Sequence, residues 1–163
     1  MFDFFVSVKA GAAISLVPEG LAVFPLQLSS FTQDQKITVW YSVPMVLALL
    51  QAGGRLEERD LVALRWVLFA GEVFPTKHLR TLMERLPHPR YANLYGPTET
   101  NVCAYYKIEP FSLEQTAPIP IGKACANTDL IPINAEGKES SRPTRKAFLH
   151  AGIHRYARLL RPP

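Results

Sequence analysis

Apolar and polar residues follow two different periods along this chain, and the two periods alternate. Short runs of β-branched and aromatic residues, such as Ile-Thr-Val-Trp-Tyr at residues 37–41, are typical of buried strands. Other stretches carry apolar residues three or four positions apart, as at Leu79, Leu82 and Leu86, and this spacing predicts amphipathic helices. The pattern therefore predicts strands and helices in turn.

Helices are expected over residues 3–10, 25–35, 44–53 and 75–86, and strands over 12–17, 37–41, 65–70, 91–95 and 102–108. Pro44 begins one helix and Gly53-Gly54 ends it. In the preceding helix, Leu26 and Phe31 are expected on the inner face. Strands and helices in alternation indicate an α/β fold, a mostly parallel sheet with helices on both faces.

Three predicted strands end next to residues that could contact a ligand. Tyr41, Ala70 and Tyr95 each lie at the carboxyl end of a predicted strand. In open α/β sheets, ligands bind beyond these ends. A binding site is therefore expected at this edge of the sheet.

The run Asn-Leu-Tyr-Gly-Pro-Thr-Glu-Thr at residues 93–100 concentrates chemistry at that edge. Tyr95 can stack on a flat base, and Thr98 can donate a hydrogen bond to a phosphate oxygen. Glu99 can hold a hard cation such as Mg²⁺. Gly96 permits close backbone approach, and Pro97 fixes the turn. The alternative is a plain surface turn, because Gly-Pro turns are common.

This run resembles the nucleotide motif of the adenylate-forming ligases, in particular the amino-acid adenylation domains of nonribosomal peptide synthesis. Residues 67–72 (Val-Leu-Phe-Ala-Gly-Glu) resemble the strand and loop that flank the adenine there, and residues 120–128 resemble the segment after the motif. The resemblance covers residues 2–133. It implies part of the large N-terminal domain of such a ligase, that is, a partial AMP-binding core.

The resemblance implies a site for ATP and Mg²⁺. Tyr95 matches the tyrosine that stacks on adenine, Asn93 the side chain that reaches the adenine amino edge, and Gly71 the backbone over the other ring face. Gly96 belongs to the same turn. Thr98 matches the residue near the phosphates, and Glu99 the carboxylate that holds Mg²⁺.

The same resemblance implies an amino-acid pocket of mostly apolar residues without charge, made of Phe2, Tyr41, Leu68, Ala70, Leu94, Val102 and Cys103. Such a pocket suits a compact apolar side chain. The series is similar to that of free-standing ligases that load L-proline onto a carrier protein, although Phe2 stands where leucine is expected. The alternative is that Leu68, Ala70 and Val102 are ordinary core residues.

Other parts of the family pattern do not occur in this sequence. The Lys-containing phosphate loop, the aspartate that holds the ribose and the lysine of the small C-terminal domain are all missing. We expect a fragment of an amino-acid-activating ligase that is inactive alone. We assign no catalytic residue within it. The alternatives are a non-catalytic binding or interaction module of the same fold and a fragment of a related acyl-CoA-type ligase.

Charge and composition change near residue 134. The chain of 163 residues has a net charge of +4, but residues 1–130 carry 11 Lys/Arg and 12 Asp/Glu, and residues 131–163 carry 7 and 2. The basic character thus belongs to the tail, and the body does not predict a nucleic-acid partner.

Codons compatible with residues 145–163, shifted by one base, can encode a run that resembles the next family motif. We expect residues 134–163 to be a frameshifted, disordered tail outside the family pattern. The alternative is a genuine basic extension that contacts an acidic carrier protein or nucleic acid.

The two cysteines, Cys103 and Cys125, have apolar neighbours and no Cys-x-x-Cys spacing, so reduced buried thiols are expected. No apolar stretch approaches the ~18 residues of a membrane span, and no signal-peptide pattern is present. A cytoplasmic protein is expected, with a proline-like amino acid and a peptidyl carrier protein as partners and without nucleic acid or membrane.

Overall fold

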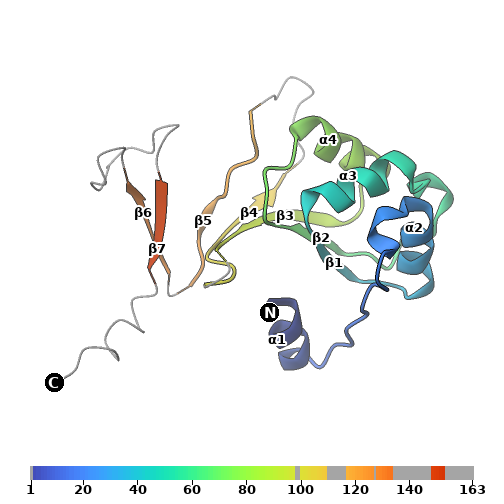
Figure 1. Ribbon diagram of the computed structural model, residues 1–163, viewed down its shortest axis with the longest axis horizontal. Helices are drawn as coiled ribbons and strands as arrows, with labels where there is room; N and C mark the ends of the chain where they lie inside the picture. The colour runs from blue at the N-terminus through green and yellow to red at the C-terminus, as the bar shows by residue number, and fades with distance from the viewer. Residues whose placement is uncertain (1, 98–99, 110–116, 127, 134–147, 153–163) are drawn as a thin grey trace.

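A five-stranded sheet lies at the centre of the computed structural model, which describes residues 2–97, 100–109, 117–126, 128–133 and 148–152. Its strands, in spatial order, are β1 (Val39–Ser42), β2 (Trp66–Phe69), β3 (Arg90–Tyr95), β4 (Ala104–Ile108) and β5 (Lys123–Ala124). The pairs β1–β2 and β2–β3 are parallel, and β4 is antiparallel to both β3 and β5. The sheet is therefore mixed, with β4 running against the other strands (Figure 1).

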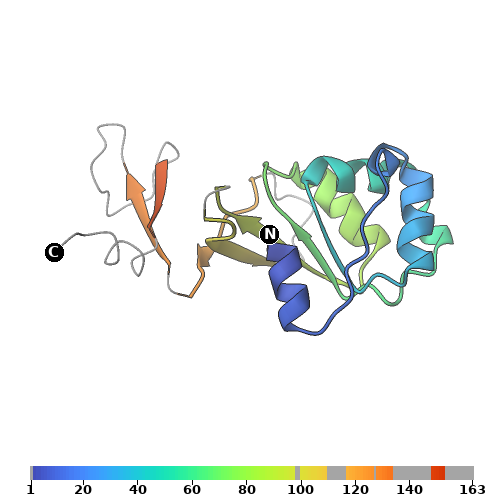
Figure 2. The same ribbon diagram turned by 60° about the horizontal axis from the view of Figure 1, so that its bottom comes forward.

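Four helices accompany the sheet: α1 (Phe2–Lys9), α2 (Pro25–Asp34), α3 (Pro44–Gly53) and α4 (Thr76–Arg85). The short 3₁₀ turns η1 (Leu21–Val23) and η2 (Leu56–Glu58) connect them to their neighbours. Figures 1 and 2 show α3 and α4 against one face of the sheet with α2 beside α3, while α1 lies on the other side. The α/β fold predicted from the sequence is confirmed.

Helices α3 and α4 form where their end signals and apolar spacing predicted them. Pro44 occupies the first turn of α3, where its missing N–H has no intrahelical partner to lose, and Gly54 follows the last residue. In α4, Leu79 and Leu82 are fully buried, and Leu86 just beyond the helix is also buried. The predicted inner face of α4 is confirmed.

The predicted inner face of α2 was wrong. The buried residues are Leu28, Ser29 and Thr32, whereas Leu26 is exposed and Phe31 is half-buried. The hydroxyls of Ser29 and Thr32 can be buried because each donates a hydrogen bond to a carbonyl of its own helix, at 2.9 Å and 2.8 Å. Apolarity alone therefore selected the wrong side of this helix.

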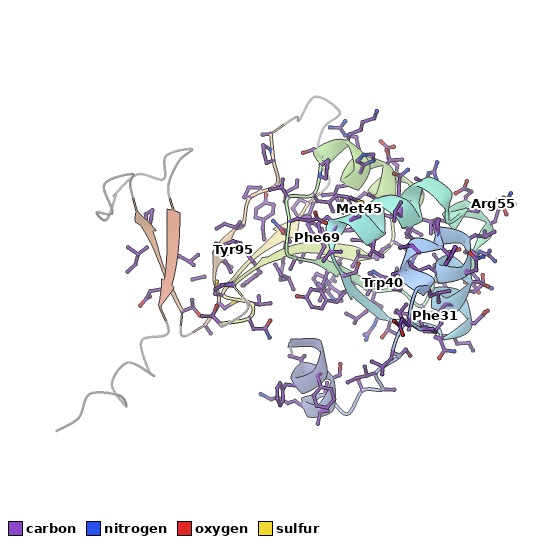
Figure 3. The ribbon with its side chains drawn as sticks, viewed as in Figure 1. Phe31, Trp40, Met45, Arg55, Phe69 and Tyr95 are labelled. Carbon is purple, nitrogen blue, oxygen red and sulfur yellow. The ribbon has the colours of Figure 1, made fainter. Side chains whose placement is uncertain are left out.

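The core lies between the sheet and α3 and α4. Trp40, Val67, Tyr91 and Ile108 stand in register across β1, β2, β3 and β4 and are all buried. We call this side of the sheet the helix-covered face. Phe69, two residues after Val67, packs edge-on against Phe74 with ring centroids 5.0 Å apart (Figure 3).

The other side of the sheet, the open face, is also apolar but less covered. Tyr41, Leu68 and Ala92 stand in register there, and Leu94 pairs with Tyr105. Ala92 and Leu94 are buried, but Tyr41, Leu68 and Tyr105 are only half-buried. The nearby helix α1 leaves Phe4, Phe5, Val6 and Val8 exposed, so it buries little apolar surface.

The strand predicted over residues 12–17 was wrong. These residues are exposed and form no strand, and the side chain of Leu16 is 82% exposed. An extended segment becomes a strand only when a neighbour accepts and donates its backbone hydrogen bonds. No described strand pairs with this segment, so its apolar pattern stays without a sheet.

A second, two-stranded antiparallel sheet joins β6 (Asp129–Ile133) to β7 (Phe148–Gly152). The sequence did not predict this pairing, because residues 148–152 fall in the basic tail. The rest of that tail, residues 134–147 and 153–163, lies outside the described residues. The domain boundary after residue 133 stays a prediction.

Candidate functional site

Three of the predicted site residues lie at the carboxyl edge of the parallel strands. Tyr41 is the penultimate residue of β1, Ala70 follows β2 directly, and Tyr95 ends β3. The backbone N–H of Ala70 donates to the carbonyl oxygen of Ser42 at 3.3 Å, so the strand ends remain joined past the regular ladder. Figure 3 places Tyr95 at the end of β3, away from Trp40 and Phe69 of the core.

The loop after β2 is attached to the start of α3. An oxygen of the Glu72 carboxylate accepts a hydrogen bond from the backbone N–H of Met45 at 3.0 Å. The first N–H groups of a helix have no partner within the helix, and negative charge is favourable there. In the sequence, Glu72 stands out only as the last residue of the run that resembles the adenine-flanking strand and loop. Its bond to Met45 could not be foreseen, because the two lie 27 positions apart.

Alternation along β3 divides the predicted site residues between the two faces of the sheet. Side chains of successive residues in a strand point to opposite faces. Asn93 and Tyr95 share the parity of Tyr91, which belongs to the helix-covered face, whereas Leu94 belongs to the open face.

The predicted amino-acid-pocket residues gather on the open face. Tyr41 pairs directly with Leu68, and continuing the β2–β3 register by one step past the strand end sets Ala70 opposite Leu94. These four side chains are buried or half-buried. Asn93 and Tyr95, which match adenine-binding residues, therefore lie on the other face of the sheet from Tyr41, Leu68 and Leu94, which match the amino-acid pocket.

The side-chain amide of Asn93 has a partner that the sequence did not reveal. Its Nδ2 donates to the carbonyl oxygen of Pro120 at 2.9 Å. Among the described residues, none donates a hydrogen bond to its amide oxygen. That oxygen could therefore accept a hydrogen bond from an amino group such as the exocyclic amine of adenine.

The turn after β3 is tightly folded. A Cβ atom on Gly96 would lie 1.5 Å from the carbonyl oxygen of Asn101, so only glycine fits this position. The backbone N–H of Thr100 donates to the carbonyl oxygen of Pro97 at 3.2 Å. Thr98, Glu99 and the side chain of Phe2 lie outside the described part of the structure.

Cys103 is held against the end of β3. Its backbone N–H donates to the carbonyl oxygen of Tyr95 at 2.8 Å, and its thiol donates to the same oxygen at 3.4 Å. The side chain is buried, and neighbouring Val102 is half-buried. Cys103 and Tyr95, which sequence analysis matched to different parts of the site, are therefore direct neighbours.

A cleft lies at the other end of the strands. It encloses about 470 Å³, and its walls include Trp66, Arg90 and Lys107. Trp66 and Arg90 begin β2 and β3, so this cleft lies at the amino ends of the strands, opposite the candidate site. It contains none of the predicted site residues.

Comparison with known proteins identifies the family. Residues 1–146 match the family described as AMP-binding enzyme. The chain belongs to this family. An L-proline–[L-prolyl-carrier protein] ligase of Streptomyces coelicolor is 42% identical over 151 residues, covering 91% of this chain and 28% of the ligase. The ligase of the same name from Pseudomonas fluorescens is 41% identical over 130 residues, covering 80% of this chain and 26% of the relative.

A solved structure gives the same family likeness in three dimensions. The adenylation domain AlmE of Vibrio cholerae, crystallised with glycyl-adenosine-5′-phosphate, is 31% identical, with a TM-score of 0.69. The match covers 85% of this chain and 25% of that structure. The chain therefore spans about a quarter of the length of these members of the AMP-binding enzyme family.

Of the residues predicted to contact ATP, the described part of the chain includes those matched to the adenine, whereas Thr98 and Glu99 lie outside it. Asn93 offers an amide oxygen, and Tyr95 offers a half-buried ring. Among the described residues, no three His, Cys, Asp or Glu side chains form a group that could hold a metal ion. None of the described helices combines the length and the apolar character that a bilayer crossing requires.

Proposed function

We propose that this chain is part of an ATP-dependent ligase that activates an amino acid as aminoacyl-AMP and loads it onto a carrier protein. L-proline is the proposed amino acid. The observation that carries this proposal is the division of the site residues across β3 and its neighbours. Asn93 and Tyr95 lie on one face, and Tyr41, Leu68, Ala70 and Leu94 lie on the other.

On the nucleotide side, we assign adenine recognition to Tyr95, Asn93 and the backbone of Gly71. The ring of Tyr95 supplies a flat surface, and the amide oxygen of Asn93 supplies an acceptor for an amino group. Gly71 has a backbone φ of +100° and no side chain, so an adenine can approach its peptide closely. ATP would supply the adenylyl group, Glu99 would hold Mg²⁺, and Thr98 would donate a hydrogen bond to a phosphate oxygen.

On the substrate side, we assign the wall of the pocket to Tyr41, Leu68, Ala70 and Leu94, with Val102, Cys103 and Phe2 completing it. Ala70 is small, so it leaves space where a larger residue would not. None of these side chains carries a charge, which favours a compact apolar substrate such as proline over a charged one. The names of the two similar ligases support the same amino acid.

The isolated 163-residue chain should not catalyse adenylation. Charge develops on the phosphates and on the acyl phosphate, and cations must balance it. The sequence holds neither a Lys-containing phosphate loop nor the family's catalytic lysine. We expect no proline-dependent pyrophosphate exchange by the purified chain, and clear exchange would contradict this account of the missing groups.

The decisive experiment uses a full-length chimeric protein. In it, this chain is joined to the segments of the Streptomyces coelicolor ligase that it does not match. Ala70→Trp should lower kcat/KM for proline by about 5-fold to 150-fold, because overpacking costs ~1–3 kcal/mol and ~1.4 kcal/mol is tenfold. ATP binding should change little. Glu99→Gln removes a charge from the proposed Mg²⁺ site, so it should slow activation of every amino acid without changing the order of preference.

The measured quantity is the ratio of kcat/KM for proline to kcat/KM for valine in each variant. If Glu99→Gln shifts this ratio as much as Ala70→Trp does, the proposed division into a nucleotide side and a substrate side is wrong. If the chimeric protein binds a carrier protein but exchanges no pyrophosphate with any amino acid, the interaction module becomes the better description.

A further inference from the structure

The two cysteines of the chain face each other across neighbouring strands. Ala104 pairs with Ala124, and Tyr105 pairs with Lys123, in the antiparallel ladder of β4 and β5. One step further along this register sets Cys103 directly opposite Cys125. The backbone N–H of Cys125 donates to the carbonyl oxygen of Cys103 at 2.8 Å, so hydrogen bonding between the two segments continues one residue past the ladder.

This position brings the two thiols close to disulfide geometry. Residues directly opposite in antiparallel strands have Cα atoms about 4.5–5.5 Å apart and side chains on the same face. A disulfide needs Cα atoms about 4.4–6.8 Å apart and Cβ atoms about 3.5–4.5 Å apart. A Cα separation of facing strand residues therefore suits a disulfide, and the Cβ atoms of such a pair need to approach by about 1 Å. The thiol of Cys103 must also leave the carbonyl oxygen of Tyr95.

The two thiols differ in access to solvent. Cys103 is 2% exposed, whereas Cys125 is partly exposed, and both are free thiols. A dissolved oxidant therefore reaches Cys125 first. Burial, and next the neighbouring Cys103, raise the pKa of the Cys125 thiol, so little of it is thiolate at neutral pH and its reaction should need a higher pH than that of an ordinary thiol.

We propose that Cys103 and Cys125 form a redox-active dithiol that closes to an intramolecular disulfide on reaction with a small disulfide such as oxidised glutathione. The Cys125 thiolate attacks one glutathione sulfur, forming a mixed disulfide and releasing one glutathione thiolate. The Cys103 thiolate then attacks the Cys125 sulfur, forming the Cys103–Cys125 bond and releasing the second glutathione. The protein loses two electrons and two protons, and the oxidised glutathione gains them. This proposal concerns strand geometry and does not depend on the proposed function.

The test equilibrates the full chain with reduced and oxidised glutathione, quenches it with acid and maps the peptides by mass spectrometry. The fraction with linked Cys103 and Cys125 peptides is measured in buffer and in concentrated urea. We expect the equilibrium constant for the internal disulfide to be roughly tenfold or more higher in buffer, and dithiothreitol to reverse it. Equal constants, a lasting glutathione adduct on Cys125 or cross-links between chains would each overturn the proposal.

A register shift provides the matched control. The double variant Cys125→Ser with Ala126→Cys moves the second thiol by one residue, out of the position opposite Cys103 and into the turn that follows β5. The shift lengthens the loop between the two cysteines by one residue, which hardly changes the entropy of loop closure in the unfolded chain. The equilibrium constants of the two proteins in urea should therefore agree. In buffer, the equilibrium constant for the internal disulfide should be lower for the shifted pair than for the native pair. If the shifted pair closes as readily as the native pair in buffer, the strand register does not hold the dithiol together.

Single variants test the order of attack. Cys103→Ser should accumulate a glutathione adduct on Cys125, faster at higher pH. Cys125→Ser should leave Cys103 almost unreactive in buffer. The proposed sequence of steps is wrong if Cys103 reacts as fast as Cys125 in these variants.

Discussion

Glu72 and Met45 join two separate parts of the molecule, because the Glu72 carboxylate accepts the backbone N–H of Met45 at 3.0 Å. The bond ties the loop after β2 to the first turn of α3. That loop also contains Gly71, so the same contact helps to hold the proposed adenine-binding backbone in place.

Replacing Glu72 with alanine should destabilise the chain by about 0.5–1 kcal/mol, the lower part of the range for helix caps, because the bond is exposed. Glu72→Gln should cost less, since the amide can still accept the hydrogen bond. The midpoint of urea unfolding measures the difference. Glu19→Ala is the control, because Glu19 is exposed in a segment without helix or strand. Equal effects at both positions would remove the role assigned to the Glu72–Met45 bond.

Gly122 allows β4 and β5 to approach each other. Its backbone φ is +83°, and an added Cβ would lie 2.0 Å from the carbonyl oxygen of Tyr105. Gly122→Ala should therefore combine backbone strain with a collision and loosen the β4–β5 ladder. Gly20 has a similar φ of +75° with no atom within 4 Å of an added Cβ.

Gly20→Ala thus measures the strain alone, about 1–2 kcal/mol for a residue forced into the left-handed region. Gly122→Ala should cost clearly more than this in urea unfolding, and it should speed hydrogen exchange at the amide of Cys125. A cost no greater than that of Gly20→Ala would show that the two strands do not need their close approach.

Tyr91 should make the chain sensitive to alkali. Its hydroxyl donates to the carbonyl oxygen of Leu86 at 2.7 Å, and burial raises the pKa of the phenol. Above pH about 10, the ordinary pKa of tyrosine, the unfolded chain releases this proton while the folded chain keeps it. The contribution of Tyr91 to stability should thus be complete below that pH and decline above it.

Comparing the chain with Tyr91→Phe isolates this effect, because the other tyrosines are common to both. The substitution should cost about 1 kcal/mol near neutral pH through the lost hydrogen bond. The difference in free energy of unfolding between the two proteins should become smaller as the pH rises above about 10. A difference that stays constant up to strongly alkaline pH would mean that Tyr91 ionises equally in both states.

The exposed apolar residues at the N-terminal end should make the isolated chain associate. Phe4 and Phe5 of α1 are 58% and 63% exposed, and Leu16 is 82% exposed. Replacing Phe5 and Leu16 with serine should shift sedimentation toward the monomer, because the substitutions remove exposed apolar area. Val62→Ser, at a residue 77% exposed in another part of the chain, is the control. A wild-type chain that sediments as a monomer and unfolds sharply and reversibly would contradict the expectation.

The sequence predicted best those features whose cause is local. Pro44 and Gly53-Gly54 set the ends of α3, and the spacing of Leu79 and Leu82 set the buried side of α4, because these signals act within one helix. The strand over residues 12–17 failed because a strand needs a neighbour, which a single segment cannot report. The two-residue strand β5 and the β6–β7 ladder were missed for the same reason.

The candidate site was predictable in its place but not in its connections. Strand ends are visible in the sequence, so Tyr41, Ala70 and Tyr95 could be gathered at one edge in advance. The bonds from Asn93 to Pro120 and from Met45 to Glu72 each span 27 positions, and only the folded chain brings them together. The facing of Cys103 and Cys125 likewise depends on the register of β4 and β5.

The alternation of side chains along β1 and β2 places one tryptophan on each face of the sheet, so tryptophan fluorescence can report on each face separately. Trp40 is buried on the helix-covered face, whereas Trp66 pairs with Val39, has the opposite parity and lies half-buried with the Arg90 guanidinium 5.6 Å from its ring. These are the two tryptophans of the chain. With Trp66→Phe, the remaining emission reports on the packing of α3 and α4, and with Trp40→Phe it reports on whatever settles on the opposite surface. The fluorescence of two single-tryptophan proteins can therefore distinguish loosening of the core from docking of a missing segment.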